Sequence, residues 1–216
     1  MPSVTRVGRL GVLILATLSL TMTSAYAATW TVRAGTTTVG STSWSGASTG
    51  SSPQLRFIDG TTTFEVDCSS ATLSGAVPHL GSGLSGPLLS VTGATISGGC
   101  TAAPVGAMSA TISGSMSFNG SSYGAAVTTG WLSGVSWHFT NPICSFTVTG
   151  ATDATYNNST RILNLQPIGG SGHVLTANVA GGGSTCAGQV HNGDPFSWLV
   201  SLNVSTPLGP LVITSP

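Results

Sequence analysis

The sequence contains no lysine and has few charged residues of any kind. Its 216 residues include five arginines and five acidic residues, so 5% of the chain is charged, whereas an average soluble domain is about 25% charged. Only Arg33, Arg56 and Arg161 follow residue 27, and they are scattered. Binding to nucleic acid needs clustered positive charge to neutralise phosphates. The composition therefore excludes nucleic acid as a partner and leaves Ser, Thr, Asn and Gly to form the polar surface.

Helical periodicity is also missing. Apolar residues do not recur with a 3.6-residue period over three turns at any point, and the many glycines and β-branched residues disfavour helix. The chain should therefore be built from strands.

Only one apolar run is long, and it lies near the N-terminus at residues 10–20. It follows Arg6 and Arg9 and is too short to span a bilayer comfortably. Ala25-Tyr26-Ala27 then gives the A-x-A pattern of a signal-peptide cleavage site. We predict a signal peptide at residues 1–27 and a single secreted domain at residues 28–216, extracellular or associated with the cell wall. The mature chain should lack a transmembrane segment. An uncleaved membrane anchor is the alternative.

Alternation with a period of two residues dominates the rest of the chain. It is clearest between residues 130 and 150, where a Trp131–Phe139 segment and a Cys144–Val148 segment flank an Asn-Pro corner. Such alternation is typical of strands with one face in a core and one in water. Trp131, Trp137 and Trp198 should be core residues. Many short strands separated by Gly and Asn turns predict an all-β fold, either an antiparallel β-sandwich or a β-barrel.

Two dipeptides predict hairpin turns. Asp59-Gly60 and Asn119-Gly120 are the residue pairs that tight β-turns favour, since glycine accepts a positive φ. Asn192-Gly193-Asp194-Pro195 should form a compact turn before the last long strand.

The four cysteines lack a Cys-x-x-Cys pair, so a metal site is disfavoured and we predict no metal. In an exported protein an even number of cysteines indicates disulfides. Of the three pairings, Cys68–Cys100 with Cys144–Cys186 is preferred, because each links sequence neighbours and closes a loop of similar length. Each bridge should stabilise the fold by roughly 3–4 kcal/mol on the chain-entropy model.

Catalytic constellations are weak. His79, His138, His173 and His191 are far apart in the sequence. The pair His191 and Asp194 is the strongest catalytic candidate, but the Asn-Gly-Asp-Pro turn explains Asp194 without catalysis.

Two other motifs give no better catalytic site. Residues 120–124 match G-x-S-x-G, yet the nucleophile elbow requires a strand before it and a helix after it. Glu65 and Asp67 share an outer strand face, which is ordinary solvation and not an acid beside a base. Enzymatic activity is therefore uncertain and disfavoured, and no cofactor is predicted.

Trp44 is the candidate binding residue. It lies in a Ser/Gly-rich stretch without apolar neighbours, and we expect an exposed loop there. An exposed indole can stack on a sugar or pack against a partner protein.

Several segments together resemble a known group of proteins. These are TWTV at 29–32, TTFEVDC at 62–68, Gly99-Cys100, HNGDP at 191–195 and ITSP at 213–216. Across nearly the whole mature region the chain resembles small secreted actinobacterial proteins of unknown function. The resemblance implies a location outside the cell and disulfides, and it implies no activity.

The sequence thus favours a secreted, non-enzymatic β-domain with a structural or binding role at the cell surface. Its partner would be a cell-wall glycan or another surface protein, and the oligomeric state is open. Three alternatives remain: a carbohydrate-binding module that uses loop aromatics, a small secreted hydrolase, and a β-barrel carrier of an apolar ligand.

Overall fold

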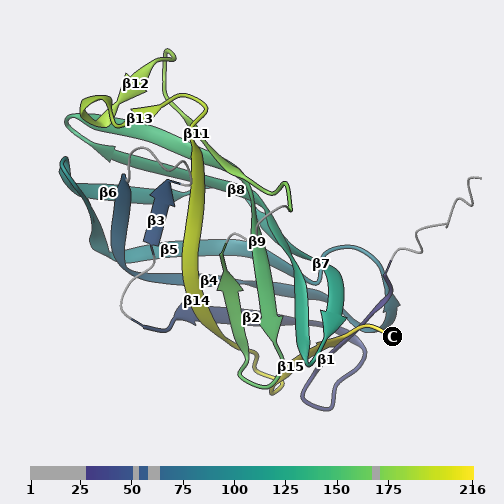
Figure 1. The fold of residues 1–216 in the computed structure, drawn as a ribbon. Coiled ribbons are helices and arrows are strands. Elements are labelled where there is room, and N and C mark those ends of the chain that lie inside the picture. The colour runs from purple at the N-terminus through teal and green to yellow at the C-terminus, as the bar shows by residue number, and fades with distance from the viewer. Residues whose placement is uncertain (1–27, 51–53, 58–63, 167–170) are drawn as a thin grey trace, which may run out of the picture.

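The computed structural model describes residues 28–50, 54–57, 64–166 and 171–216, and Figure 1 shows their arrangement. Within these ranges the chain forms strands and one 3-10 turn, with no α-helix, which confirms the all-β prediction. The strands are β1 (Trp30–Ala34), β2 (Gly40–Ser48), β3 (Gln54–Phe57), β4 (Glu65–Leu84), β5 (Leu89–Ala102), β6 (Gly106–Ile112), β7 (Met116–Gly124), β8 (Val127–Asn141), β9 (Cys144–Asn157), β10 (Ile162–Leu165), β11 (Leu175–Asn178), β12 (Ser184–Thr185), β13 (Val190–His191), β14 (Pro195–Ser205) and β15 (Leu211–Thr214), with the 3-10 turn η1 at Cys186–Gly188.

The strand pairings close into a ring. Each strand pairs with the next in the order β4, β2, β14, β10, β9, β8, β6 and β5. Strand β5 then pairs with β4, which closes the ring. Every one of these pairs is antiparallel. Strands β8, β9 and β14 pass in front of β4 and β5 in Figure 1. The fold is therefore a closed barrel, which decides between the two architectures that the sequence left open.

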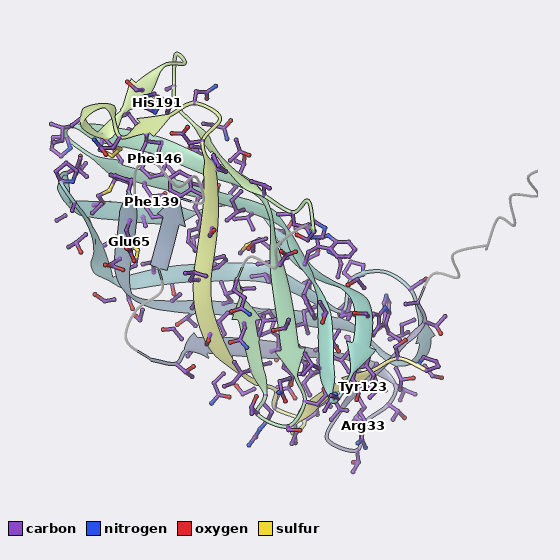
Figure 2. All side chains as sticks on the ribbon, viewed as in Figure 1. Arg33, Glu65, Tyr123, Phe139, Phe146 and His191 are labelled. Carbon is purple, nitrogen blue, oxygen red and sulfur yellow. A yellow bond between two sulfur atoms is a disulfide. The ribbon has the colours of Figure 1, made fainter. Side chains whose placement is uncertain are left out.

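Aromatic rings fill the interior of this barrel. Phe146 lies 5.3 Å from Phe139 and 5.5 Å from Phe196, measured between ring centroids, and Phe139 and Phe146 can be followed in Figure 2. The indoles of Trp137 and Trp198 cross edge to face with centroids 3.7 Å apart. A ring of eight strands encloses a space that side chains can fill. The interior is thus a packed core, and this packing argues against a carrier of an apolar ligand.

Both predicted disulfides are present. Cys68–Cys100 joins β4 to β5 at positions that are directly paired in the sheet. Cys144–Cys186 ties the start of β9 to η1, and so anchors the small β12–β13 hairpin at one end of the molecule. Figure 2 shows His191 at this end, away from Arg33 and Tyr123. The preferred pairing is confirmed.

The predicted Asn119-Gly120 turn is wrong. Both residues lie inside β7, and the chain reverses at Ala125 and Ala126, which have φ values of 49° and 65°. Gly120 serves a close contact instead of a turn, because a Cβ there would collide with the Trp30 ring. Asp59-Gly60 lies outside the described residues, as does the predicted signal peptide.

The free edge of β15 is capped by side chains of β8, β9 and the following turn. The Asn158 amide donates to the Ile213 carbonyl and accepts from its N–H, and the Tyr156 hydroxyl donates to the Leu211 carbonyl at 2.9 Å. Burial raises the pKa of Tyr156, so the hydroxyl stays a donor. These bonds close an edge that would otherwise be open to pairing with another chain.

Among the described residues, no helix has the length and hydropathy needed to cross a membrane.

Candidate functional site

A bulge in β8 turns Trp131 to the outer face of the barrel. Leu132 is buried below it, and the next buried residue is Val135 and not residue 134, because the register shifts between Ser133 and Val135. Gly134 occupies the bulge with a φ of 75°. A glycine at this point accepts the left-handed backbone that a bulge requires. The prediction that Trp131 is a core residue is therefore wrong, whereas Trp137 and Trp198 are buried as expected.

Three outward positions form a row across neighbouring strands. Asn119 of β7 pairs with Trp131 of β8, and Trp131 pairs with Asp153 of β9. Residues directly opposite in antiparallel strands bring their side chains within contact distance on one face of the sheet. Trp131 therefore stands between an amide and a carboxylate.

Asp153 is a buried carboxylate on this outer face. Only 2% of the residue is exposed, although an acid is rarely buried without a partner. His173 Nδ1 lies 2.8 Å from Asp153 Oδ1, and the Ser171 hydroxyl donates to Asp153 Oδ2 at 2.7 Å. The backbone N–H of His173 donates to Ser171 Oγ at 3.2 Å. These bonds give the buried acid its hydrogen-bond partners.

The geometry fixes the state of His173. A carboxylate only accepts hydrogen bonds. The ring nitrogen Nδ1 of His173 therefore carries a hydrogen and donates a hydrogen bond to Asp153. The other ring nitrogen, Nε2, has no hydrogen-bond partner among the described residues, and 30% of the side chain is exposed. The imidazole stacks on Trp131 with ring centroids 4.9 Å apart and planes inclined by 17°.

A surface pocket of about 430 Å³ adjoins Trp131. It is lined by Ala28, Trp30, Ser85, Gly86, Asn119, Gly120, Ser121 and Trp131. None of these residues carries a charged side chain, and the two tryptophans and the glycine backbone give it a largely apolar wall. The pocket thus combines indole surface with neutral polar groups.

Asn119 offers this pocket a hydrogen-bond acceptor. Its amide nitrogen donates to the Ser117 carbonyl at 3.0 Å and to Ser133 Oγ at 3.1 Å, which fixes the orientation of the amide. The amide oxygen has no partner among the described residues. An oriented acceptor beside an aromatic ring suits a ligand that carries hydroxyl groups.

Trp44 does not form the exposed platform that the sequence predicted. It lies in β2 and not in a loop, it is 2% exposed, and its indole N–H donates to the Ser90 carbonyl at 2.9 Å. Its strand neighbours Ser43 and Ser45 point outward, so the Ser/Gly composition reflects the other face of the strand. Trp44 is a core residue, and the prediction that its indole is exposed is wrong.

His191 and Asp194 do meet, but as parts of a turn. Asp194 Oδ2 accepts the backbone N–H of His191 at 2.6 Å and lies 3.3 Å from the ring nitrogen Nδ1. The His191 side chain is 60% exposed. The carboxylate closes the Asn-Gly-Asp-Pro turn, as the alternative interpretation of the sequence proposed.

Within the described residues, the fold gives G-x-S-x-G, His79 and His138 no catalytic partner. G-x-S-x-G lies in β7 and is followed by the turn into β8, so the strand-to-helix context of a nucleophile elbow is missing. His79 is exposed on β4, and His138 bonds across the β8–β9 pair to Thr147. Within the described ranges, no group of three or more His, Cys, Asp or Glu residues could hold a metal ion.

Sequence reasoning missed the Trp131, Asp153 and His173 cluster. A signal was present, since strict alternation would place Leu132 in water and Ser133 in the core. Gly134 inside a strand pattern is a sign of a bulge. A bulge at Gly134 moves Leu132 into the core and Ser133 to the outer face, as the structure shows. No comparable signal joins His173 to Asp153, because a loop brings them together.

Comparison of the chain with protein-family models, with curated proteins and with solved structures finds no match.

Proposed function

We propose that this protein is an exported, non-enzymatic binding domain that holds a neutral saccharide in the pocket beside Trp131. The observation that carries the proposal is the outward indole of Trp131 at the edge of a pocket whose lining side chains carry no charge. Saccharides present apolar C–H faces together with hydroxyl groups. Indole surface suits the faces, and Asn119 Oδ1 suits a hydroxyl donor.

Size and charge support this ligand class. Pockets of about 300–1,000 Å³ are typical of small-molecule sites, and the Trp131 pocket, at about 430 Å³, is within that range. No side chain that lines the pocket carries a counter-charge for a strongly ionic ligand, and the predicted cleavage after residue 27 would add only the α-amino group of Ala28. A neutral sugar does not need one.

The pocket wall favours binding over hydrolysis. A glycosidase uses two carboxyl groups on either side of the scissile bond, and no acid is among the residues that line the pocket. In the described part of the chain, no serine hydroxyl bonds to a histidine ring, so an activated serine nucleophile has no support either.

Export remains part of the proposal. The predicted signal peptide supplies the route, and the two disulfides are compatible with an oxidising compartment. The resemblance to secreted actinobacterial proteins stays a prediction. On this proposal the ligand would be a glycan of the cell surface.

The experiment replaces Trp131 by alanine in the secreted chain and measures binding to soluble hexasaccharides of β-1,4-linked glucose and of N-acetylglucosamine by calorimetry. We expect wild-type protein to bind one of them and Trp131→Ala to weaken binding at least tenfold, about 1.4 kcal/mol. Ile143→Ala is the matched control, since Ile143 is 64% exposed and lies outside the pocket. Equal binding by Trp131→Ala and wild type, or no binding of either sugar by wild type, contradicts the proposal.

A further inference from the structure

Asp153 and His173 do not line the pocket, yet they form a hydrogen-bonded cluster next to it. The acid is buried on an outer face of the sheet, and both of its oxygens are engaged by residues 171–173. Solvated surface residues do not require such an arrangement. It meets the pocket at Trp131, which is paired with Asp153 in the sheet and stacked against His173.

We infer that Asp153 and His173 are positioning residues that hold the Trp131 indole in its ligand-binding orientation before the ligand arrives. This inference rests on the proposed function. It assigns a role to two residues that touch no ligand and act through the indole.

The hydrogen bond sets the plane of the imidazole. An N–H of a histidine ring points along the ring plane, so the bond from Nδ1 to Asp153 fixes both the position and the tilt of the ring. Ser171 holds the second carboxylate oxygen, which keeps the carboxylate from rotating. The orientation of the imidazole ring is therefore fixed by Asp153, a residue of β9.

The stack transmits this order to the indole. The two rings are nearly parallel, at 17° and 4.9 Å, an offset-stacking geometry that aromatic pairs favour. A partly exposed tryptophan on a β-strand would otherwise sample several rotamers. Binding to a side chain that is already ordered avoids the entropic cost of immobilising it, worth about 2- to 12-fold in affinity.

The test measures two quantities in the full secreted chain: affinity for the hexasaccharide that wild type binds, and the mobility of Trp131 from ¹⁹F NMR with fluorotryptophan. The Trp131 signal is assigned by its loss in Trp131→Phe. We expect His173→Ala to weaken binding about 3- to 10-fold and to shift and average the Trp131 signal. His173→Phe keeps a ring but loses the bond to Asp153, so it should recover only part of the affinity lost in His173→Ala.

A double-mutant cycle separates positioning from a general loss of stability. If Asp153 acts through His173, Asp153→Ala combined with His173→Ala should bind no more weakly than His173→Ala alone. Asp153→Asn keeps the shape and one hydrogen bond to the ring, and should stay close to wild type. This isosteric variant keeps the test valid even if Asp153→Ala does not fold.

Three results overturn the inference. One is wild-type affinity and an unchanged Trp131 signal in His173→Ala, in a protein where Trp131→Ala has lost binding; the proposed function then stands alone. Another is additive loss in the double variant. The third is cleavage of the hexasaccharide that His173→Ala abolishes, which makes His173 catalytic. If Trp131→Ala binds normally, the proposed function fails, and the ¹⁹F signal still tests whether His173 orders the indole.

Discussion

Two histidine–aspartate pairs lie at different places on the barrel, and they differ in every physical respect. His173 and Asp153 are 20 residues apart in the sequence, and Nδ1 of His173 lies 2.8 Å from Oδ1 of Asp153. The Asp153 side chain is 3% exposed. His191 and Asp194 are three residues apart, lie 3.3 Å from each other, and have side chains that are 60% and 22% exposed. The first pair depends on the whole sheet, whereas the second needs only a turn.

This difference shows why proximity in sequence is a poor guide to a functional pair. A turn places a carboxylate near a histidine because Asp bonds to nearby backbone N–H groups, whether or not the ring has a role. A buried acid is another matter, since the fold must supply partners to keep it there. Burial and distance in the fold therefore separate the two pairs, and residue type does not.

The largest effect on stability is expected from removing the Cys144–Cys186 disulfide, which anchors the hairpin that carries His191. Replacing Cys144 and Cys186 by alanine should lower the free energy of unfolding by about 4 kcal/mol on the chain-entropy model. It should loosen the β12–β13 hairpin that carries His191 and leave the His173–Asp153 bond intact. Urea unfolding and amide hydrogen exchange measure these two effects.

The control for that experiment is the other bridge. Replacing Cys68 and Cys100 by alanine should cost a similar free energy, about 4 kcal/mol, without selective loss of protection at His191. Loss of protection at His173 and His191 together in the first variant would show that the two pairs belong to one cooperative unit.

An intermediate effect is expected from deleting each carboxylate. Asp153→Ala leaves the donors of Ser171 and His173 without their charged acceptor and should cost about 2 kcal/mol. Asp194→Ala removes one exposed turn bond and should cost about 1 kcal/mol or less. Chemical denaturation of both variants measures the contrast, and equal losses would remove the distinction between a fold-dependent pair and a turn.

The smallest effect concerns the histidine tautomers and involves no change in stability. His173 should carry its proton on Nδ1, because Asp153 accepts from that nitrogen. His191, with a long and exposed contact, should show a mixture of tautomers. Long-range ¹H–¹⁵N NMR of the histidine rings distinguishes the forms, and a mixed population at His173 would contradict the structure-based assignment.

Much of the barrel could be predicted from local pattern. The alternation at Cys144, Phe146 and Val148 places each of these residues in the core, as observed. Trp131 was assigned to the wrong face because strict alternation was followed through Gly134, where the strand bulges. Composition misled at Trp44 in a similar way, because a Ser/Gly stretch can be either a loop or the outer face of a strand.

Turn chemistry was also only partly informative. Asn119-Gly120 matches the best hairpin dipeptide, yet the packing of Trp30 over Gly120 takes precedence, and two alanines make the turn in left-handed geometry. The Asn-Gly-Asp-Pro turn was predicted correctly, and the fold reinforces its local preference: the Gly193 N–H donates to the Ala177 carbonyl at 2.8 Å, and Asn192 Oδ1 accepts from the Val179 N–H at 3.1 Å.

The sequence by itself determined the all-β class, the expectation of disulfides and the scarcity of surface charge, since these follow from residue type, spacing and composition. It gave only a preference among the three cysteine pairings. Only the tertiary structure decided that the sheet closes into a barrel, which of the three cysteine pairings forms, and that Asp153, rather than Asp194, holds the buried histidine contact. Closure and burial arise from contacts between residues far apart in the chain. No local pattern contains those contacts, because the free energy that selects them comes from packing the whole sheet.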